Sequence, residues 1–224
     1  MDHLARGGFF VYTGYMKTPS PTTDEIFTKL LELSALSFRY GETFRFTTYP
    51  DGKTLESDTD HTFMLGMVAC VLRDHCAPEL DRGKVAEYAL VHDFVEVYAG
   101  DTATLGMLDK SEKEVREHQA LLRIKSEYDE LFPWIGEAIE KYESQTEPEA
   151  RFVKVIDKIM PGLTQIQNGG EIFERLQIPP EQIIEQKNQQ LVWLEKQGWP
   201  LLTELYKKVS QKAHSLPYFT KKLT

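Results

Sequence analysis

Residues 90 to 101 read LVHDFVEVYAGD, and this stretch decides the fold. Leucine, valine, phenylalanine and tyrosine fill most of its positions, which predicts a helix that is buried on most sides. His92, Asp93 and Glu96 interrupt the apolar pattern. In a helix His92 and Glu96 stand one turn apart on the same face and Asp93 lies about 100° round, so all three can converge on one pocket between helices.

Buried imidazole and carboxylate groups without partners are costly, and a metal ion is the commonest compensation for such a grouping. The alternative is that His92 and Asp93 only cap or pair with neighbours inside a helical core, because a His-Asp dipeptide is frequent by chance. Two further residues favour the metal. His61 begins the preceding apolar helix, and Asp157 interrupts the apolar run at residues 152–160.

Helical periodicity recurs on both sides of this stretch, and no segment alternates convincingly with period two. We therefore expect an all-α helical bundle with the metal site between helices. Residues 43–60 should form a long loop with room for a hairpin at residues 49–52, and Pro161 should kink or end its helix. The expected helices span residues 24–41, 60–75, 82–98, 111–131, 134–143, 147–168, 180–197 and 201–214.

The chain of 224 residues with 41% hydrophobic content can bury one large core without disulfides. We expect an irregular tail at residues 1–23, one domain at residues 24–170, and a helical extension at residues 171–224 packed on the same domain. The four-residue apolar run at residues 9–12 is too short for a signal peptide or a membrane span.

The formal net charge of −9 disfavours binding to a nucleic-acid polymer or to an anionic membrane across a broad face. A small anionic substrate remains compatible if a metal or an arginine supplies local positive charge. Cys70 and Cys76 form no CxxC pair. A disulfide framework is therefore not expected, and the composition favours a reducing, cytoplasmic setting.

The order His61, then His92-Asp93, then the distant Asp157 resembles the signature of the HD superfamily of metal-dependent phosphohydrolases. Within it, the chain resembles the 5′-deoxynucleotidase branch over roughly residues 24–170. The matching stretches are SDTDH at 57–61, ALVHD at 89–93 with Glu96 and residues 100–101, YESQ at 142–145, and ARFVK at 150–154.

This resemblance implies that His61, His92, Asp93 and Asp157 hold one divalent metal ion. Two imidazoles and two carboxylates suit Mn, Co, Fe, Ni or Zn, and Mg is also considered, so the identity of the ion stays open. Such an ion lowers the pKa of its bound water and neutralises phosphoryl oxygens.

Glu96 and Asp101 match the family's two carboxylates beside the metal that are not ligands. One of them could activate the attacking water while the other protonates the leaving group, and the sequence does not say which. The plainer alternatives are a solvated carboxylate on a helix face for Glu96 and a turn residue after Gly100 for Asp101.

The family also places an arginine upstream of the first histidine to bind the phosphate. Arg39 is our first choice and Arg45 the second, and Tyr40 is a candidate for stacking on the sugar or base. An exposed arginine and a core tyrosine are the alternatives. The loop between Arg45 and His61 is several residues longer than is usual in the family.

The resemblance therefore predicts a metal-dependent hydrolase of (deoxy)nucleoside 5′-monophosphates that releases nucleoside and phosphate. The alternatives are an HD hydrolase of nucleoside triphosphates or of another phosphate ester, and a non-catalytic sensor that binds nucleotide or metal. The expected partners are a small-molecule nucleotide and, from the family, a second copy of the chain.

Overall fold

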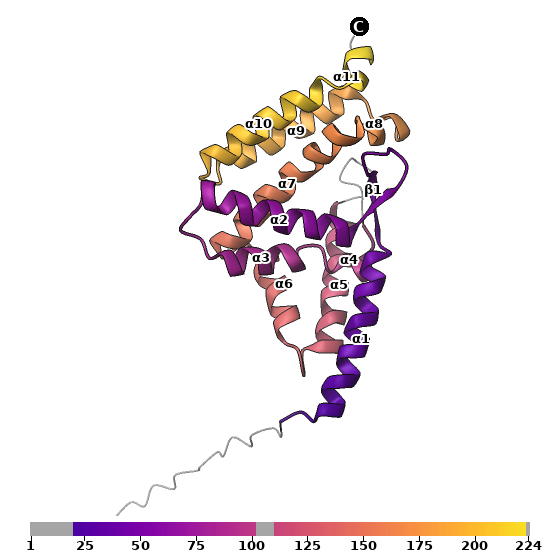
Figure 1. Ribbon diagram of the computed structural model, residues 1–224, viewed down its shortest axis with the longest axis vertical. Helices are drawn as coiled ribbons and strands as arrows, with labels where there is room; N and C mark the ends of the chain where they lie inside the picture. Colours follow the sequence, from indigo (N-terminus) through magenta and orange to yellow (C-terminus); the bar gives the residue numbers. More distant parts are fainter. Residues whose placement is uncertain (1–19, 102–109, 223–224) are drawn as a thin grey trace, which may run out of the picture.

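A computed structural model describes residues 20–101 and 110–222. Its described residues form helices and one two-stranded sheet (Figure 1). The all-α class is thereby confirmed, and in this part of the chain the small sheet is the one element that departs from it. Residues 1–19 of the expected tail lie outside the described ranges. The elements are α1 Thr23–Gly41, β1 Phe44–Thr48, β2 Leu55–Ser57, α2 Asp58–Cys76, α3 Arg82–Val91, α4 Glu96–Ala99, α5 Lys110–Tyr128, α6 Trp134–Ser144, α7 Pro148–Asn168, α8 Glu171–Arg175, α9 Pro180–Glu195, α10 Pro200–His214 and α11 Pro217–Lys222.

The start of α2 is fixed by a capping box. The Ser57 side chain accepts a hydrogen bond from the backbone N–H of Asp60, and the Asp60 carboxylate accepts one from the backbone N–H of Ser57. These two bonds satisfy N–H groups that the first turn of a helix leaves without partners. The cap thereby sets the position of His61, which follows directly in the first turn.

The segment expected as a loop is an antiparallel hairpin, in which Phe44 pairs with Ser57 and Thr48 with Leu55. Its turn is held by Asp51, whose carboxylate accepts hydrogen bonds from the backbone N–H groups of Lys53 and Thr54. The hairpin, drawn beside α2 and α8 in Figure 1, carries Arg45 and Glu56 toward the middle of the molecule.

The expected helix over residues 82–98 was wrong in its second half, because α3 ends at Val91 and residues 92–95 form a turn. The His92 ring nitrogen Nδ1 lies 2.8 Å from the Ala89 carbonyl oxygen, the acceptor that the backbone N–H of residue 93 would use in a continued helix. The backbone N–H of Glu96 then bonds to the Asp93 carbonyl, three residues back. The turn, rather than a helix face, therefore orients His92 and Asp93.

Helix α7 lies at the centre of the described core and packs against α2, α3, α6 and α10. Pro161 lies inside α7 and does not end it, contrary to one of the two expectations for this residue. Pro161 lines the cavity at the functional site. Gly169 and Gly170, both with φ of 76°, end the helix in a backbone conformation that other residues rarely adopt.

The chain beyond α7 forms α8 to α11. Helix α10 packs on α7 and on α9, and α9 contacts α11 (Figure 1). The short helices α8 and α11 were not expected from the sequence, since each holds fewer than two turns of periodic pattern. Among the described residues, no helix is both long and apolar enough to cross a membrane.

Candidate active site

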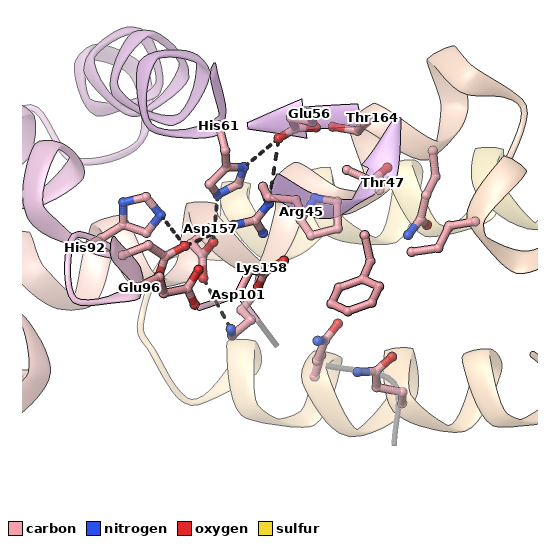
Figure 2. A pocket seen from close by; sticks show the side chains of 18 of the residues that line it. Arg45, Thr47, Glu56, His61, His92, Glu96, Asp101, Asp157, Lys158 and Thr164 are labelled. Carbon is pink, nitrogen blue, oxygen red and sulfur yellow. Dashed lines mark hydrogen bonds and ion pairs between the residues drawn. The ribbon is translucent and has the colours of Figure 1, made fainter. Parts of the chain in front are cut away.

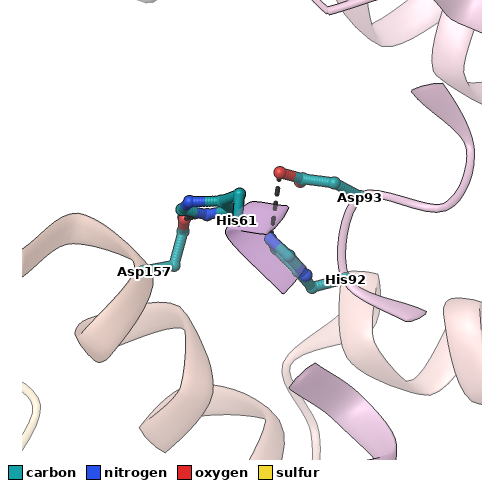
Figure 3. A group of neighbouring side chains, drawn as sticks. All are labelled: His61, His92, Asp93 and Asp157. Carbon is teal, nitrogen blue, oxygen red and sulfur yellow. Dashed lines mark hydrogen bonds and ion pairs between the residues drawn. The ribbon is translucent and has the colours of Figure 1, made fainter. Parts of the chain in front are cut away.

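Four side chains from three segments of the chain meet at one point between the helices (Figure 3). His61 comes from α2, His92 and Asp93 come from the turn after α3, and Asp157 comes from α7. One potential ligand atom from each lies within 4.8 Å of the others. The structure thus brings together all four residues that the sequence put forward as metal ligands.

Both imidazoles are oriented by their outer nitrogens. His92 Nδ1 is placed to donate to the Ala89 carbonyl, and His61 Nδ1 lies 3.2 Å from Glu56 Oε1. A histidine whose Nδ1–H is held by a carbonyl or a carboxylate presents the lone pair of Nε2, which is the usual arrangement around a metal. Glu56 therefore has the position of an orienting partner rather than of a ligand.

The inner nitrogens face the cluster. His92 Nε2 is buried and has no partner with hydrogen-bond geometry among the described residues, although Asp93 Oδ2 lies 3.0 Å away. A buried ring nitrogen in this state needs a partner, and a metal ion between the imidazoles and the carboxylates supplies one. Two imidazoles and two carboxylates fit a divalent metal, without selecting among the first-row ions.

Three further carboxylates gather beside this cluster. Asp58, Glu96 and Asp101 each offer an oxygen within 4.8 Å of the others. Burial, followed by the charges of Asp93, Asp101 and Asp58, raises the pKa of Glu96 well above its usual range. Burial also raises the pKa of Asp58, to about 7. Carboxyl groups in this state can hold a proton near neutral pH, as a general acid must.

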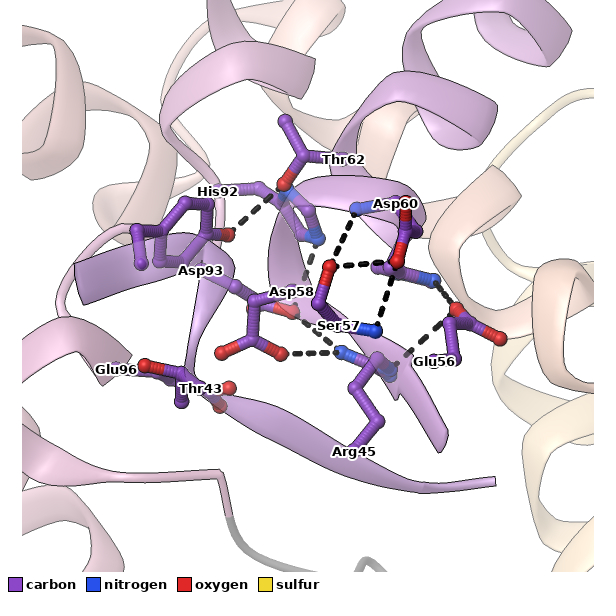
Figure 4. Close-up of polar contacts among 12 residues, drawn as sticks. Thr43, Arg45, Glu56, Ser57, Asp58, Asp60, Thr62, His92, Asp93 and Glu96 are labelled. Carbon is purple, nitrogen blue, oxygen red and sulfur yellow. Dashed lines mark hydrogen bonds and ion pairs between the residues drawn. The ribbon is translucent and has the colours of Figure 1, made fainter. Parts of the chain in front are cut away.

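Arg45 lies between the two groups (Figure 4). One of its terminal nitrogens is 3.1 Å from Asp93 Oδ2 and 3.6 Å from Asp58 Oδ1, and its Nε is 3.8 Å from Glu56 Oε1. Strand β1 holds the guanidinium there, since the preceding residue pairs with Ser57. Among the described residues Arg45 is therefore the arginine that reaches the cluster.

Arg39 and Tyr40 lie elsewhere. The Arg39 guanidinium carbon is 5.2 Å from the centre of the Tyr98 ring, and Arg39 is exposed and absent from the cavity lining. The Tyr40 hydroxyl lies 2.8 Å from the Thr62 hydroxyl, and its ring packs on Phe94 in the core. The structure thus reverses our order of the two arginines and gives Tyr40 the core position named as its alternative.

Sequence reasoning overlooked several residues at the cluster. Asp58 is the first residue of α2, directly after the N-cap Ser57, and its side chain is completely buried. The sequence offered one signal for it, because Asp58 precedes His61 by three residues. Glu56 and Lys113 gave no signal, because neither belongs to a motif. Lys113 Nζ lies 3.5 Å from Glu96 Oε1, and Lys158 Nζ lies 3.2 Å from Asp157 Oδ2.

A cavity of about 200 Å³ opens from the cluster, a size that suits a small molecule better than a polymer. Its described lining carries seven carboxylates and five lysine or arginine side chains, an excess of negative charge that favours a bound cation. Figure 2 shows His92, Glu96 and Asp101 at one end and Thr47 and Thr164 at the other.

We call these two regions the metal end and the amide end. The metal end comprises His61, His92, Asp93, Asp157, Asp58, Glu96 and Asp101. The amide end is the part of the lining contributed by β1, by α8 and α9, and by the residues of α7 that follow Pro161. It comprises Phe46, Thr47, Gln165, Phe173, Gln186, Lys187 and Gln190.

Comparison with known proteins agrees with this arrangement. The sequence model of the HD domain matches residues 42–196. The 5′-deoxynucleotidase HDDC2 of Homo sapiens is 36% identical over 104 residues, which are 46% of this chain and 50% of that protein. The Danio rerio 5′-deoxynucleotidase HDDC2 is 34% identical over 112 residues, covering 50% and 54% of the two chains. The chain thus spans about half the length of the curated relatives it matches.

A solved structure shares the fold. The predicted metal-dependent phosphohydrolase from Magnetospirillum magnetotacticum superposes with a TM-score of 0.73 and 22% sequence identity, over 88% of this chain and 97% of that one. At this level of identity the likeness concerns the fold alone.

Proposed function

The chain belongs to the HD domain family, and from this premise we propose that it is a metal-dependent hydrolase of (deoxy)nucleoside 5′-monophosphates. The observation that carries the proposal is the metal end of the cavity, where a four-residue ligand set lies beside three further carboxylates. The names of the matched relatives, all 5′-deoxynucleotidases, support the substrate class.

In this proposal His61, His92, Asp93 and Asp157 hold one divalent ion. When bound, such an ion lowers the pKa of water and neutralises charge on phosphoryl oxygens. Glu56 keeps the His61 ring in place through its 3.2 Å contact with Nδ1. The Ala89 carbonyl does the same for His92.

Arg45 is the residue that we propose to bind the substrate phosphate. Its guanidinium already neutralises Asp93 and Asp58 at the edge of the cavity, and a planar, always charged group with several donors suits phosphate oxygens. Arg39 and Tyr40 have no part in this proposal, because neither lines the cavity.

Glu96 and Asp101 are the proposed acid and base. Glu96 is 2% exposed, and burial among carboxylates favours its protonated form, so we assign to it the transfer of a proton to the leaving oxygen. Asp101 is less buried and then accepts the proton of the attacking water. Lys113, 3.5 Å from Glu96, opposes this effect, because its positive charge favours the ionised carboxylate and lowers the pKa of Glu96.

Phosphate release tests the proposal. Metal-stripped protein is mixed with deoxy- and ribonucleoside monophosphates, nucleoside triphosphates and an aryl phosphate, with Mn, Co, Mg or Zn added separately. We expect metal-dependent release from deoxynucleoside monophosphates. Release only from triphosphates would instead indicate the triphosphate hydrolase, and no release from any substrate despite bound metal would indicate a sensor.

We also propose that two copies of the chain associate. Apolar side chains remain exposed along one face each of α1 and α2, with Phe38 75% and Phe63 68% exposed, and a second copy would cover them. Sedimentation should show a dimer that the double variant Phe63→Glu, Met67→Glu dissociates. A wild-type monomer at all concentrations would contradict this. The patch comprises Phe27, Leu30, Leu31, Phe38, Phe63, Met67 and Val71.

A cytoplasmic location is our last proposal on function. Cys70 and Cys76 are free and only half-buried, which suits a reducing compartment. Imaging of a fluorescent fusion checks the location, and retention in a secretory compartment would contradict it.

A further inference from the structure

The amide end of the cavity has no task in the phosphate chemistry proposed above. Three glutamine side chains, Gln165 from α7 with Gln186 and Gln190 from α9, line it together with aromatic and aliphatic groups. Gln190 Oε1 accepts a hydrogen bond from the Tyr206 hydroxyl at 2.8 Å, so this amide is partly engaged in packing. Gln165 is different.

Gln165 is 8% exposed, and its Oε1 is buried without a hydrogen-bond partner among the described residues. Native proteins rarely leave a buried amide oxygen without a hydrogen-bond donor, because such an oxygen has lost its bonds to water and gained none in return. Gln165 is one of the residues that line the cavity, so its amide stands next to the space that a ligand would fill. A glutamine amide offers a donor and an acceptor side by side.

The position of Gln165 on α7 relates it to the metal end. Asp157, Pro161 and Gln165 are spaced four residues apart and all line the same cavity. Eight residues of α-helix span about 12 Å, so Gln165 lies roughly that far along α7 from the ligand Asp157. This span is comparable to the length of a nucleoside monophosphate from its phosphate to the far edge of its base.

The remaining lining fits a flat heterocycle. Phe46 is half-buried and gives the cavity aromatic surface on which a base can pack. It packs against the cluster that contains the fully buried Phe173. Lys187 lines the same region, and no carboxylate of the described residues forms an ion pair with it. Its ammonium can donate to a base carbonyl or ring nitrogen.

We propose that the amide end binds the nucleobase of the substrate and that the Gln165 amide pairs with the edge of the base. Proteins that enclose single bases read them in this way, by hydrogen bonds to the edge and by packing on aromatic or apolar side chains. The inference rests on the proposed function for the place of the phosphate. It makes Gln165 a residue for substrate selection that leaves the chemical step unaffected.

The test compares Gln165→Met, which keeps the volume and removes the amide, with the matched control Gln182→Met on the exposed side of α9. The substrates are a deoxynucleoside 5′-monophosphate and 2-deoxyribose 5-phosphate, which lacks the base. Loss of one hydrogen bond to a buried group predicts a fall in kcat/KM of roughly tenfold for the nucleotide, through KM, and little change for the sugar phosphate. Gln182→Met should match the wild type on both.

Equal losses on the two substrates, or no loss on either, would overturn the base subsite while leaving the phosphohydrolase proposal standing. Thermal unfolding of Gln165→Met checks the fold, and Gln165→Asn, which retains a shorter amide, should recover part of the nucleotide activity.

A second measurement does not depend on turnover. Calorimetry of the metal-free protein with the free deoxynucleoside should show binding that Gln165→Met weakens and Gln182→Met does not. If no phosphate is released with any metal but the nucleoside still binds in this way, the phosphohydrolase proposal is contradicted and the proposed base subsite is supported. Absence of nucleoside binding by an active, folded protein would contradict the subsite.

Discussion

The two ends of the cavity differ in how their polar groups are satisfied. At the metal end the charged side chains lie close to opposite charges or orienting partners, as in the contacts of Arg45 with Asp93 and of His61 with Glu56. The buried atoms that lack a hydrogen bond there, such as His92 Nε2 and both Asp58 carboxylate oxygens, belong to the groups of potential metal ligands. At the amide end Gln165 is buried with its oxygen unpaired and Lys187 has no acidic partner among the described residues. We infer that the metal end is built for a fixed ion, whereas the polar groups of the amide end find their partners in the substrate.

The largest expected effect belongs to the metal end. His92→Ala removes one of the four proposed ligand atoms, so metal content and phosphate release should both fall to the level of the metal-stripped protein. Binding of free nucleoside at the amide end should survive. Elemental analysis, phosphate release and calorimetry on the same preparation separate the two ends, and simultaneous loss of nucleoside binding from a folded variant would show that they are not independent.

Glu96→Gln comes next, because it removes a proton donor and no ligand. We expect kcat to fall by roughly 10²–10⁴-fold with the metal retained. The raised pKa of Glu96 means that the protonated form persists to higher pH than for an ordinary carboxyl, so the wild-type rate should decline on the alkaline side as this proton is lost. Metal loss in the variant, or an unchanged kcat, would remove Glu96 from the chemistry.

A smaller effect is expected at Glu56, which contacts His61 from outside the ligand set. Glu56→Ala should lower metal affinity or activity by roughly 10–100-fold, as is typical for residues that orient a ligand. Glu56→Gln keeps an acceptor for the Nδ1–H group and should lose less. Titration with Mn²⁺ distinguishes the variants, and equal affinities for all three proteins would refute the orienting role.

These residues also show where prediction from sequence succeeds. Hydrophobic periodicity located the main helices, and the resemblance to the HD superfamily selected four side chains, His61, His92, Asp93 and Asp157, whose potential ligand atoms the fold brings within 4.8 Å of one another. The same reasoning from periodicity wrongly extended a helix past His92. Periodicity does not reveal that the His92 side chain bonds to the Ala89 carbonyl, the oxygen that a backbone N–H would bond to if the helix continued.

The order of preference between Arg39 and Arg45 could not be decided from the sequence, for a related reason. Only the hairpin pairing of β1 with β2 turns Arg45 toward Asp93, and such a contact between residues 48 positions apart cannot be read from local pattern. Gln165 gave no signal either, since one glutamine on a helix is ordinarily solvated. Its importance follows from burial, which depends on the packing of α7 against the rest of the molecule.

The smallest predicted effect concerns stability at the amide end. Burial lowers the pKa of Lys187 to about 8, below the 10.5 expected in the unfolded chain. The unfolded state therefore binds more protons between these values, and the free energy of unfolding should rise with pH from about 8 to 10.5. Lys187→Met removes the cost of the buried charge and should stabilise the protein at pH 7 by on the order of 2 kcal/mol. This figure is smaller than the full pKa shift would give, because part of the lysine side chain remains in contact with solvent.

Thermal unfolding of Lys187→Met against the exposed control Lys196→Met checks this expectation. The gain should be full below pH 8 and vanish above about pH 10.5. A gain in the free energy of unfolding that does not depend on pH would mean that the Lys187 ammonium is solvated and that the amide end is open to water.

The central claim is that one ion occupies the point where His61, His92, Asp93 and Asp157 meet, beside but apart from Asp58, Glu96 and Asp101. The most direct measurement is the anomalous scattering of crystals grown with Mn²⁺. We predict one strong peak within coordination distance of the four ligands. A peak held by the three carboxylates instead, or none at either cluster at saturating Mn²⁺, would contradict the account.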